Sequence, residues 1–272
     1  MKHTLKVTLL ILSLFFAAQI IGLFIVNKYL AVERLPFNIE RPKYDERTSF
    51  LPISIAILIG TLFVLLLAKL KAVRIWKFWF FLSVLFTLVI AFGAFLNQYI
   101  ALLLASILSI WKIFRPNFVV QNFTELFIYA GLAAIFVPVL NLLSVTILLF
   151  IISVYDMWAV WKSKHMIKLA QFQTDSRLFA GINLQYGYKE QNKKSTVKTA
   201  IVGGGDIAFP LLFSGVILKV FNLQNALIVS LFSAVALFAL LVYSKKDKYY
   251  PAMPYITAGC FIGFFIIKLI RT

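Results

Sequence analysis

The sequence is dominated by nine long runs of mostly apolar residues, separated by polar links. A helix that crosses a bilayer needs about 20 such residues, and a backbone in lipid must satisfy its own hydrogen bonds. The expected spans are Leu5–Val26, Phe50–Ala68, Trp76–Leu96, Tyr99–Phe114, Phe118–Pro138, Leu140–Trp161, Val197–Val220, Ala226–Tyr243 and Pro251–Ile270. The pattern therefore predicts an all-α membrane protein with about nine transmembrane helices.

Composition agrees with a membrane environment. Of the 272 residues, 62% are hydrophobic and 14% are charged, whereas soluble domains are about 45–50% apolar. The first run follows a basic start, as in a signal peptide, but it is longer than a signal core and has no clear cleavage site before Asn27. We expect it to be a retained helix. The one cysteine, Cys260, lies in an apolar run and is expected to pack as a small apolar residue.

The net charge of +17 is carried by links between apolar runs rather than by a continuous basic patch. This distribution argues against a nucleic-acid partner and favours contact with a lipid bilayer. The N-terminus and the even-numbered links carry 19 of the 27 Lys and Arg residues. Because such residues accumulate on the cytoplasmic side, we expect a multi-pass cell-membrane protein whose N-terminus and 162–196 link are cytoplasmic. Its C-terminus is expected to be extracellular.

Two aspartates lie inside apolar runs. Asp156 is near the end of Leu140–Trp161, and Asp206 is near the start of Val197–Val220. A carboxylate within a bilayer costs about 2.5–3.5 kcal/mol on insertion scales, so such a residue points to a function. The two runs are consecutive and antiparallel, and both acids are near the expected cytoplasmic end. Their side chains can therefore meet.

Two carboxylates that meet share one proton and titrate as a unit. One can take a proton from water while the protonated one donates to a carbonyl, which is the equipment for peptide hydrolysis without a metal. Zinc or serine–histidine chemistry needs histidine within the membrane. The only histidines, His3 and His165, are outside the expected spans. We therefore expect no metal and no cofactor.

The flanks of the acids are unusual for membrane helices. Gly203–Gly205 precede Asp206, and three glycines make poor helix and let another backbone approach closely. The β-branched stretch Thr196–Val202 could pair as a strand with an extended substrate. Pro251–Pro254 contains two prolines, which keep the start of the last run from being regular helix and let its backbone lie near the carboxylates.

Three motifs carry a resemblance to a known family. Tyr155-Asp156, Gly203-x-Gly205-Asp206 and Pro251-Ala252-Met253 resemble the YD, GxGD and PAL signatures of the GxGD-type intramembrane aspartyl proteases, the presenilin and signal peptide peptidase family. The order of the motifs and the nine-span plan also match. Met253 stands where the family has leucine, which conserves apolar bulk. The short links are similar to those of archaeal presenilin homologues, which act without accessory subunits.

The resemblance implies a presenilin-like fold and cleavage of peptide bonds within the transmembrane helices of substrate proteins. It implies that Asp156 and Asp206 are the catalytic pair and that no accessory subunit is obligatory; a homo-oligomer stays open. The residues that it implies as shaping the site or contacting substrate are Tyr155, Gly203, Gly205, Pro251, Ala252 and Met253.

Other interpretations stay open at this stage. The acids could serve as a relay in a proton- or cation-coupled transporter or channel, although no internal repeat is evident and the acids lie off the expected midplane. A catalytically silent protein of the same fold is a third class. Glu125, near a span end, is expected to be interfacial, and Gly259-xxx-Gly263 is expected to mediate close helix packing.

The chain is expected to divide into three parts. Residues 1–161 form six helices that end in the YD helix, 162–196 form a cytoplasmic loop, and 197–272 form three helices that carry the other two motifs. The 162–196 link is expected to be solvated, and it contains one apolar patch, Leu178–Ile182. The resemblance implies self-cleavage in this link.

Overall fold

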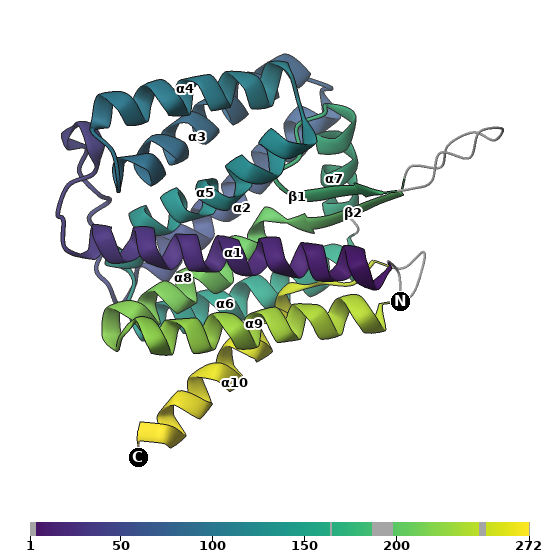
Figure 1. The fold of residues 1–272 in the computed structure, drawn as a ribbon. Coiled ribbons are helices and arrows are strands. Elements are labelled where there is room, and N and C mark those ends of the chain that lie inside the picture. Colours follow the sequence, from purple (N-terminus) through teal and green to yellow (C-terminus); the bar gives the residue numbers. More distant parts are fainter. Residues whose placement is uncertain (1–3, 164, 187–197, 245–248, 272) are drawn as a thin grey trace.

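Nine long helices follow the nine apolar runs in the computed structural model, which describes residues 4–163, 165–186, 198–244 and 249–271 (Figure 1). These helices are α1 (Leu5–Leu30), α2 (Phe50–Lys69), α3 (Val73–Gly93), α4 (Gln98–Phe114), α5 (Phe118–Phe136), α6 (Leu142–Met157), α8 (Gly204–Val220), α9 (Leu223–Tyr243) and α10 (Met253–Arg271). Between them lie α7 (His165–Asp175), two strands, β1 (Gly181–Tyr186) and β2 (Lys198–Gly203), and short helical turns at Pro36–Asn38, Val137–Val139 and Trp158–Lys162. The predicted all-α membrane class is confirmed.

Seven helices in the described part of the chain are long and apolar enough to cross a membrane. The other two, α4 and α8, have 17 residues each. The predicted count of about nine spans therefore holds as an approximation, with two short members.

Helix α1 runs through the middle of the bundle and packs against α5, α8 and α9 (Figure 1). Gly22 makes the contact with α8 possible, because a Cβ built there would lie 2.4 Å from a Leu211 methyl group. One turn earlier, the buried Gln19 side chain donates a 2.9 Å hydrogen bond from Nε2 to the carbonyl oxygen of Ile207. The helix that carries Asp206 is therefore supported by the first helix of the chain.

Glycine also allows α3 to approach α5 closely, and α9 to approach α10. A Cβ on Gly131 of α5 would lie 2.0 Å from the main-chain oxygen of Thr87 in α3. On α10, a Cβ on Gly259 would lie 2.6 Å from the Phe232 oxygen of α9, and one on Gly263 would lie 3.0 Å from a main-chain atom of the same helix. The predicted close packing by Gly259 and Gly263 is confirmed.

The predicted seventh span is wrong at its start, because α8 begins at Gly204 and the residues before it form β2. Thr196 and Val197 lie outside the described residues. Strand β2 pairs antiparallel with β1, so that Gly181 lies opposite Gly203. Glycine is needed at position 181, where φ is +147° and a Cβ would lie 2.2 Å from the Val202 oxygen. Glycines and β-branched residues favour this extended course over helix.

The expectation of a solvated 162–196 link is wrong for residues 178–184, whereas much of α7 is exposed. Helix α7 and strand β1 lie in this link, and Leu178, Ile182 and Leu184 are buried. Its apolar patch is therefore part of the core. The division at residues 161 and 196 stays a prediction.

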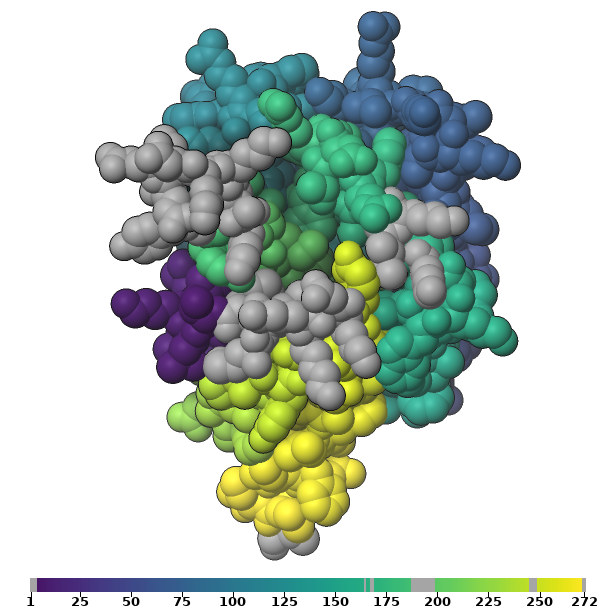
Figure 2. All heavy atoms as spheres, turned by 90° about the vertical axis from the view of Figure 1, so that its right-hand side faces the viewer, coloured from purple at the N-terminus to yellow at the C-terminus, as the bar shows by residue number. Residues whose placement is uncertain are grey.

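The polar elements gather at one end of the molecule. Figure 1 shows α7 and both strands at the same end as the N-terminus, with the C-terminus at the opposite end. Figure 2 views that end directly, and the yellow start of α10 reaches it beside the teal end of α6. The two aspartates lie near this end, at the last turn of α6 and the first turn of α8.

Candidate active site

Asp156 is held where α6 stops being a regular helix. The helix passes into one π-helical turn at Trp158–Lys162, a feature frequent at functional sites. The Asp156 side chain is 8% exposed. The main-chain amide of Met253 donates a 3.0 Å hydrogen bond to Asp156 Oδ2, and the amide of Ala252 also hydrogen-bonds this carboxylate. The carboxylate thus faces the start of α10.

The sequence of the Pro251–Pro254 segment explains why amides are free there. Met253 is the first residue of α10, and the first amides of a helix have no partner within it. Pro254 lies in the first turn, where a missing donor is tolerated. The start of a helix also carries partial positive charge, which favours a carboxylate. The main chain of this segment therefore lies beside Asp156, as the sequence predicted.

Asp206 lies in the first turn of α8 and is partly exposed. The amide of Gly203 hydrogen-bonds its carboxylate, and a Cβ on Gly203 would lie 3.3 Å from Asp206 Oδ2. Helices α6 and α8 pack together, and Asp156 is close enough to interact electrostatically with Asp206. The structure thus brings the two predicted acids together with Ala252, Met253 and Gly203.

Of the three glycines before Asp206, the most crowded is Gly204, the position that the GxGD signature leaves unspecified. A Cβ on Gly204 would lie 2.5 Å from the Tyr129 hydroxyl oxygen. A Cβ on Gly205 would meet only the Phe209 ring, at 3.4 Å. A larger residue would therefore clash at position 204, whereas at position 205 the described neighbours leave room for a Cβ.

Tyr155 links α6 to α7. Its hydroxyl forms a 2.7 Å hydrogen bond with Nε2 of His165, whose Nδ1 is 2.5 Å from the Ser163 hydroxyl. The rings of Tyr155, Trp158 and His165 are also in mutual contact. Burial lowers the pKa of His165 below its ordinary value. The side chain before Asp156 therefore fixes the neighbouring helix.

One contact near the acids was not predicted from any sequence motif. The hydroxyls of Ser153 in α6 and Thr257 in α10 are 2.8 Å apart and buried, one turn from the contact between Asp156 and Met253. Hydroxyls in apolar helices usually bond their own backbone, so the sequence did not distinguish these two. They hold the two helices in register.

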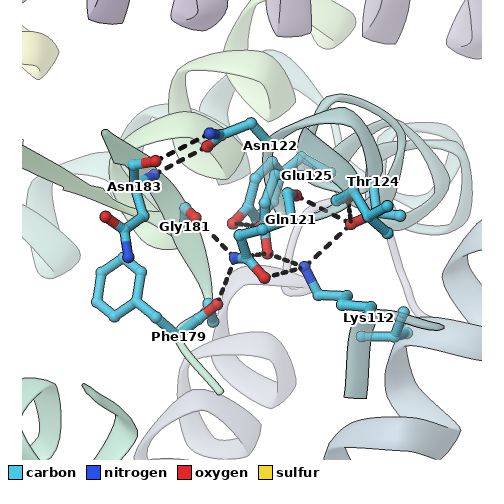
Figure 3. A network of polar contacts seen from close by, with 12 residues as sticks. Lys112, Gln121, Asn122, Thr124, Glu125, Phe179, Gly181 and Asn183 are labelled. Atoms are coloured by element: carbon cyan, nitrogen blue, oxygen red, sulfur yellow. Dashed lines mark hydrogen bonds and ion pairs between the residues drawn. The ribbon is translucent and has the colours of Figure 1, made fainter. Parts of the chain in front are cut away.

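Glu125 is not interfacial, which corrects the prediction from sequence. It is 1% exposed and pairs at 2.7 Å with Lys112 of α4, which is equally buried (Figure 3). A partner on the neighbouring helix stabilises a charge that hydropathy would place at the surface. Among the described residues, no group of three or more His, Cys, Asp or Glu side chains could hold a metal ion.

Comparison with known proteins agrees with the fold and the motifs. The family described as signal-peptide peptidase, presenilin aspartyl protease matches residues 12–272. The chain belongs to this family, and it is accordingly an intramembrane-cleaving aspartic endopeptidase, a hydrolase and a multi-pass membrane protein. The resemblance seen in the sequence is thereby confirmed.

The fold is similar to two solved structures of a presenilin family intramembrane aspartate protease. The one in space group C222 has a TM-score of 0.67 and 22% identity, and the match covers 95% of this chain and 97% of the other. The one in space group P2 has a TM-score of 0.66 and 21% identity, with 96% of each chain covered. A comparison with curated protein sequences finds no match.

Proposed function

We propose that this protease cleaves peptide bonds within the transmembrane helices of other membrane proteins, with Asp156 and Asp206 as the pair that activates water. The observation that carries the proposal is that these two carboxylates, from separate helices, lie close enough to interact electrostatically, while the Asp156 carboxylate accepts hydrogen bonds from the amides of Ala252 and Met253. The irregular backbone beside both acids also supports the proposal. Helix α6 ends in a π-helical turn, and α8 begins only at Gly204.

The chemistry needs one ionised and one protonated carboxyl group. The ionised one takes a proton from water as the water oxygen attacks the carbonyl carbon, and the protonated one gives its proton to the carbonyl oxygen. When the carbon–nitrogen bond breaks, the carboxyl group that took the proton from water gives it to the leaving nitrogen, and a hydroxyl of the tetrahedral intermediate gives its proton to the other carboxylate as the new carboxyl group forms. Each proton removed from water thus ends on a product, and the pair returns to its starting state.

The substrate helix would reach the pair between α2, α6 and α10. Support comes from the exposure of α2, which is the least buried within the protein of the seven long spans. The end of the substrate must unwind, because a helical amide is hydrogen-bonded and shielded. The unwound segment would lie along β2, whose one edge is paired with β1, since extended peptides bind by adding to sheet edges.

In the expected orientation, the N-terminus and the 162–196 link face the cytoplasm and the C-terminus faces outward. Water would then reach the acids from the cytoplasmic side. The location of both acids at helix ends, rather than at the bilayer midplane, supports this route. The chain would act without an obligatory accessory subunit.

The test is a cleavage assay with purified protein in vesicles that also contain a labelled single-span peptide. The wild type is expected to release two fragments, and a hydroxyl-containing transition-state mimic is expected to stop their release. Asp206→Asn is expected to release none. Cleavage by Asp206→Asn at the wild-type rate would remove the aspartate pair from the mechanism, and ion flux without cleavage would favour a transporter.

A further inference from the structure

One face of α5 carries polar side chains in a region where helices otherwise present apolar ones. Gln121, Glu125 and Tyr129 follow at intervals of four residues, so they project from the same side of the helix. This face is turned toward α4, β1 and the start of α8, and Figure 3 shows how its side chains converge. The position makes α5 a support for the segment that leads to Asp206.

The centre of the network is the ion pair of Lys112 and Glu125. Lys112 Nζ donates to Glu125 Oε1 at 2.7 Å, to Gln121 Oε1 at 2.8 Å and to Thr124 Oγ1 at 3.0 Å. An ammonium group has three donors, and all three are used. A buried charge whose partners are all in place is held in one geometry, because any movement would leave it unpaired.

Toward the sheet, the network holds main-chain atoms. Gln121 Nε2 donates to the carbonyl oxygens of Phe179 at 2.7 Å and Gly181 at 3.1 Å. The side chain of Asn122 donates from Nδ2 to the main-chain oxygen of Asn183 at 2.8 Å, and its Oδ1 accepts from the main-chain amide of Asn183 at 2.9 Å. The first half of β1 is thus attached to α5 rather than only to β2.

Toward α8, the network ends on Tyr129. Its hydroxyl donates to Glu125 Oε2, and its ring lies against Gly204, where a Cβ would be 2.5 Å from the hydroxyl oxygen and 2.9 Å from Cε1. On its other side, the amide of Gly204 donates at 3.0 Å to the carbonyl oxygen of Ala180. Gly204 is therefore fixed between a phenol ring and the residue that precedes β1, two residues before Asp206.

We propose that Tyr129 is a positioning residue for Asp206: the Lys112–Glu125 pair fixes its hydroxyl, and its ring then sets where Gly204 lies and where α8 begins. Tyr129 touches neither substrate nor water in this role and acts only through the backbone of Gly204. The inference rests on the proposed function for its effect on cleavage, but its effect on the backbone can be measured without any activity.

The first arm measures the backbone. Hydrogen exchange of the amides at 203–206 is compared between wild type, Tyr129→Phe and the control Tyr243→Phe, whose ring is 82% exposed at the end of α9. Loss of one hydrogen bond to a charged group is expected to speed exchange at these amides about tenfold in Tyr129→Phe. Tyr243→Phe is expected to exchange at the wild-type rate. Unchanged exchange in Tyr129→Phe would overturn the inference.

The second arm measures cleavage. Because the effect is on alignment of Asp206, kcat is expected to fall about tenfold in Tyr129→Phe while KM stays within about twofold. Affinity for the hydroxyl-containing mimic is expected to fall with kcat. A purely structural role would instead lower the melting temperature and the active fraction, with kcat per active molecule and mimic affinity unchanged, and that result would overturn the inference.

The third arm tests the contact itself. Gly204→Ala places a methyl group against the tyrosine hydroxyl, and kcat is expected to fall about a hundredfold. In Gly204→Ala combined with Tyr129→Phe, the nearest atom is removed, so kcat is expected to be no lower than in Gly204→Ala alone. If instead the two losses multiply, the residues act separately and the inference is wrong.

These arms separate the two proposals. If the wild type cleaves and Tyr129→Phe has the same amide exchange rates and the same kcat, the positioning role is refuted and the proposal of the aspartate pair stands. A wild type that does not cleave, with faster exchange in Tyr129→Phe, would refute the proposed function and keep the positioning of α8.

Discussion

The amide of Met253 lies 3.0 Å from a carboxylate oxygen of Asp156, so the last helix contacts this acid with its main chain. The Met253 side chain is 2% exposed and points into the core. This division of roles explains why methionine can stand where related proteins have leucine: the donor is the backbone, and the side chain only has to fill apolar space.

The contact predicts different effects for three substitutions at one position. Met253→Leu keeps both amide and bulk, and its cleavage rate is expected to match the wild type. Met253→Ala keeps the amide, and Met253→Pro removes it. Loss of a hydrogen bond to a charged group is worth about 1.5–3 kcal/mol, so kcat is expected to be at least about tenfold lower in the proline variant than in the alanine variant. Equal rates in the alanine and proline variants would contradict a role for the amide.

Neutralising either acid is expected to stop cleavage without loss of the fold. In Asp156→Asn or Asp206→Asn, one group can no longer exchange a proton, and the rate is expected to fall by at least about 10³-fold. Thermal unfolding in detergent is expected to stay near wild type because asparagine has nearly the same shape. Asp175→Asn, on the exposed side of α7, is the matched control. Retained cleavage in either membrane variant would exclude that acid.

Two glycines in long helices predict opposite stability effects. In Gly131→Ala, the new methyl group would meet the Thr87 oxygen, and pushing α3 from α5 is expected to cost about 1–3 kcal/mol. Gly60 has nothing within 4 Å of a built Cβ, so Gly60→Ala is expected to keep or raise the unfolding temperature. Equal melting temperatures would mean that α3 and α5 are not in backbone contact.

The buried pair predicts a rescue. Lys112→Met leaves Glu125 charged and unpaired, and the free energy of unfolding is expected to fall by about 3–5 kcal/mol. Adding Glu125→Gln removes the charge and keeps an acceptor for Tyr129, so most of this loss is expected to return. Chemical unfolding of the single and double variants measures the difference. A double variant as unstable as Lys112→Met would show that packing, not charge, holds α4 to α5.

The contact between Tyr155 and His165 predicts a pH dependence. Burial lowers the pKa of His165 below its ordinary value of 6.5, so the unfolded chain binds the proton more readily than the folded one. Stability contributed by neutral His165 is therefore present above about pH 6.5 and is lost as the pH falls below it. The melting temperature is expected to fall between pH 7.5 and 5.5, and His165→Gln is expected to remove part of that fall. If the melting temperatures of the wild type and His165→Gln depend on pH in the same way, His165 does not contribute to the pH dependence of stability.

Hydropathy and motif spacing predicted most of the architecture, because lipid requires long apolar helices whatever their partners. The same reasoning predicted a membrane helix that starts at Val197, whereas Lys198–Gly203 form a strand within the apolar run. The separate expectation of a strand at Thr196–Val202 agrees with β2 over the residues that the structure describes. Hydropathy was also wrong about Glu125, which is buried and paired with Lys112 of the neighbouring helix. The error at Glu125 has a physical cause: a run of residues shows how apolar a helix is, but not whether another helix supplies a partner for its charge.

The course of α1 has a consequence for how the protein is made. Gln19 contacts the Ile207 oxygen, which follows it by 188 residues. At a synthesis rate of about 5–20 residues per second, the partner of Gln19 emerges roughly 10–40 s after it. The first helix can therefore meet α5 early, but it waits in the bilayer for α8 and α9, and its contact with the helix that carries Asp206 forms only late in synthesis.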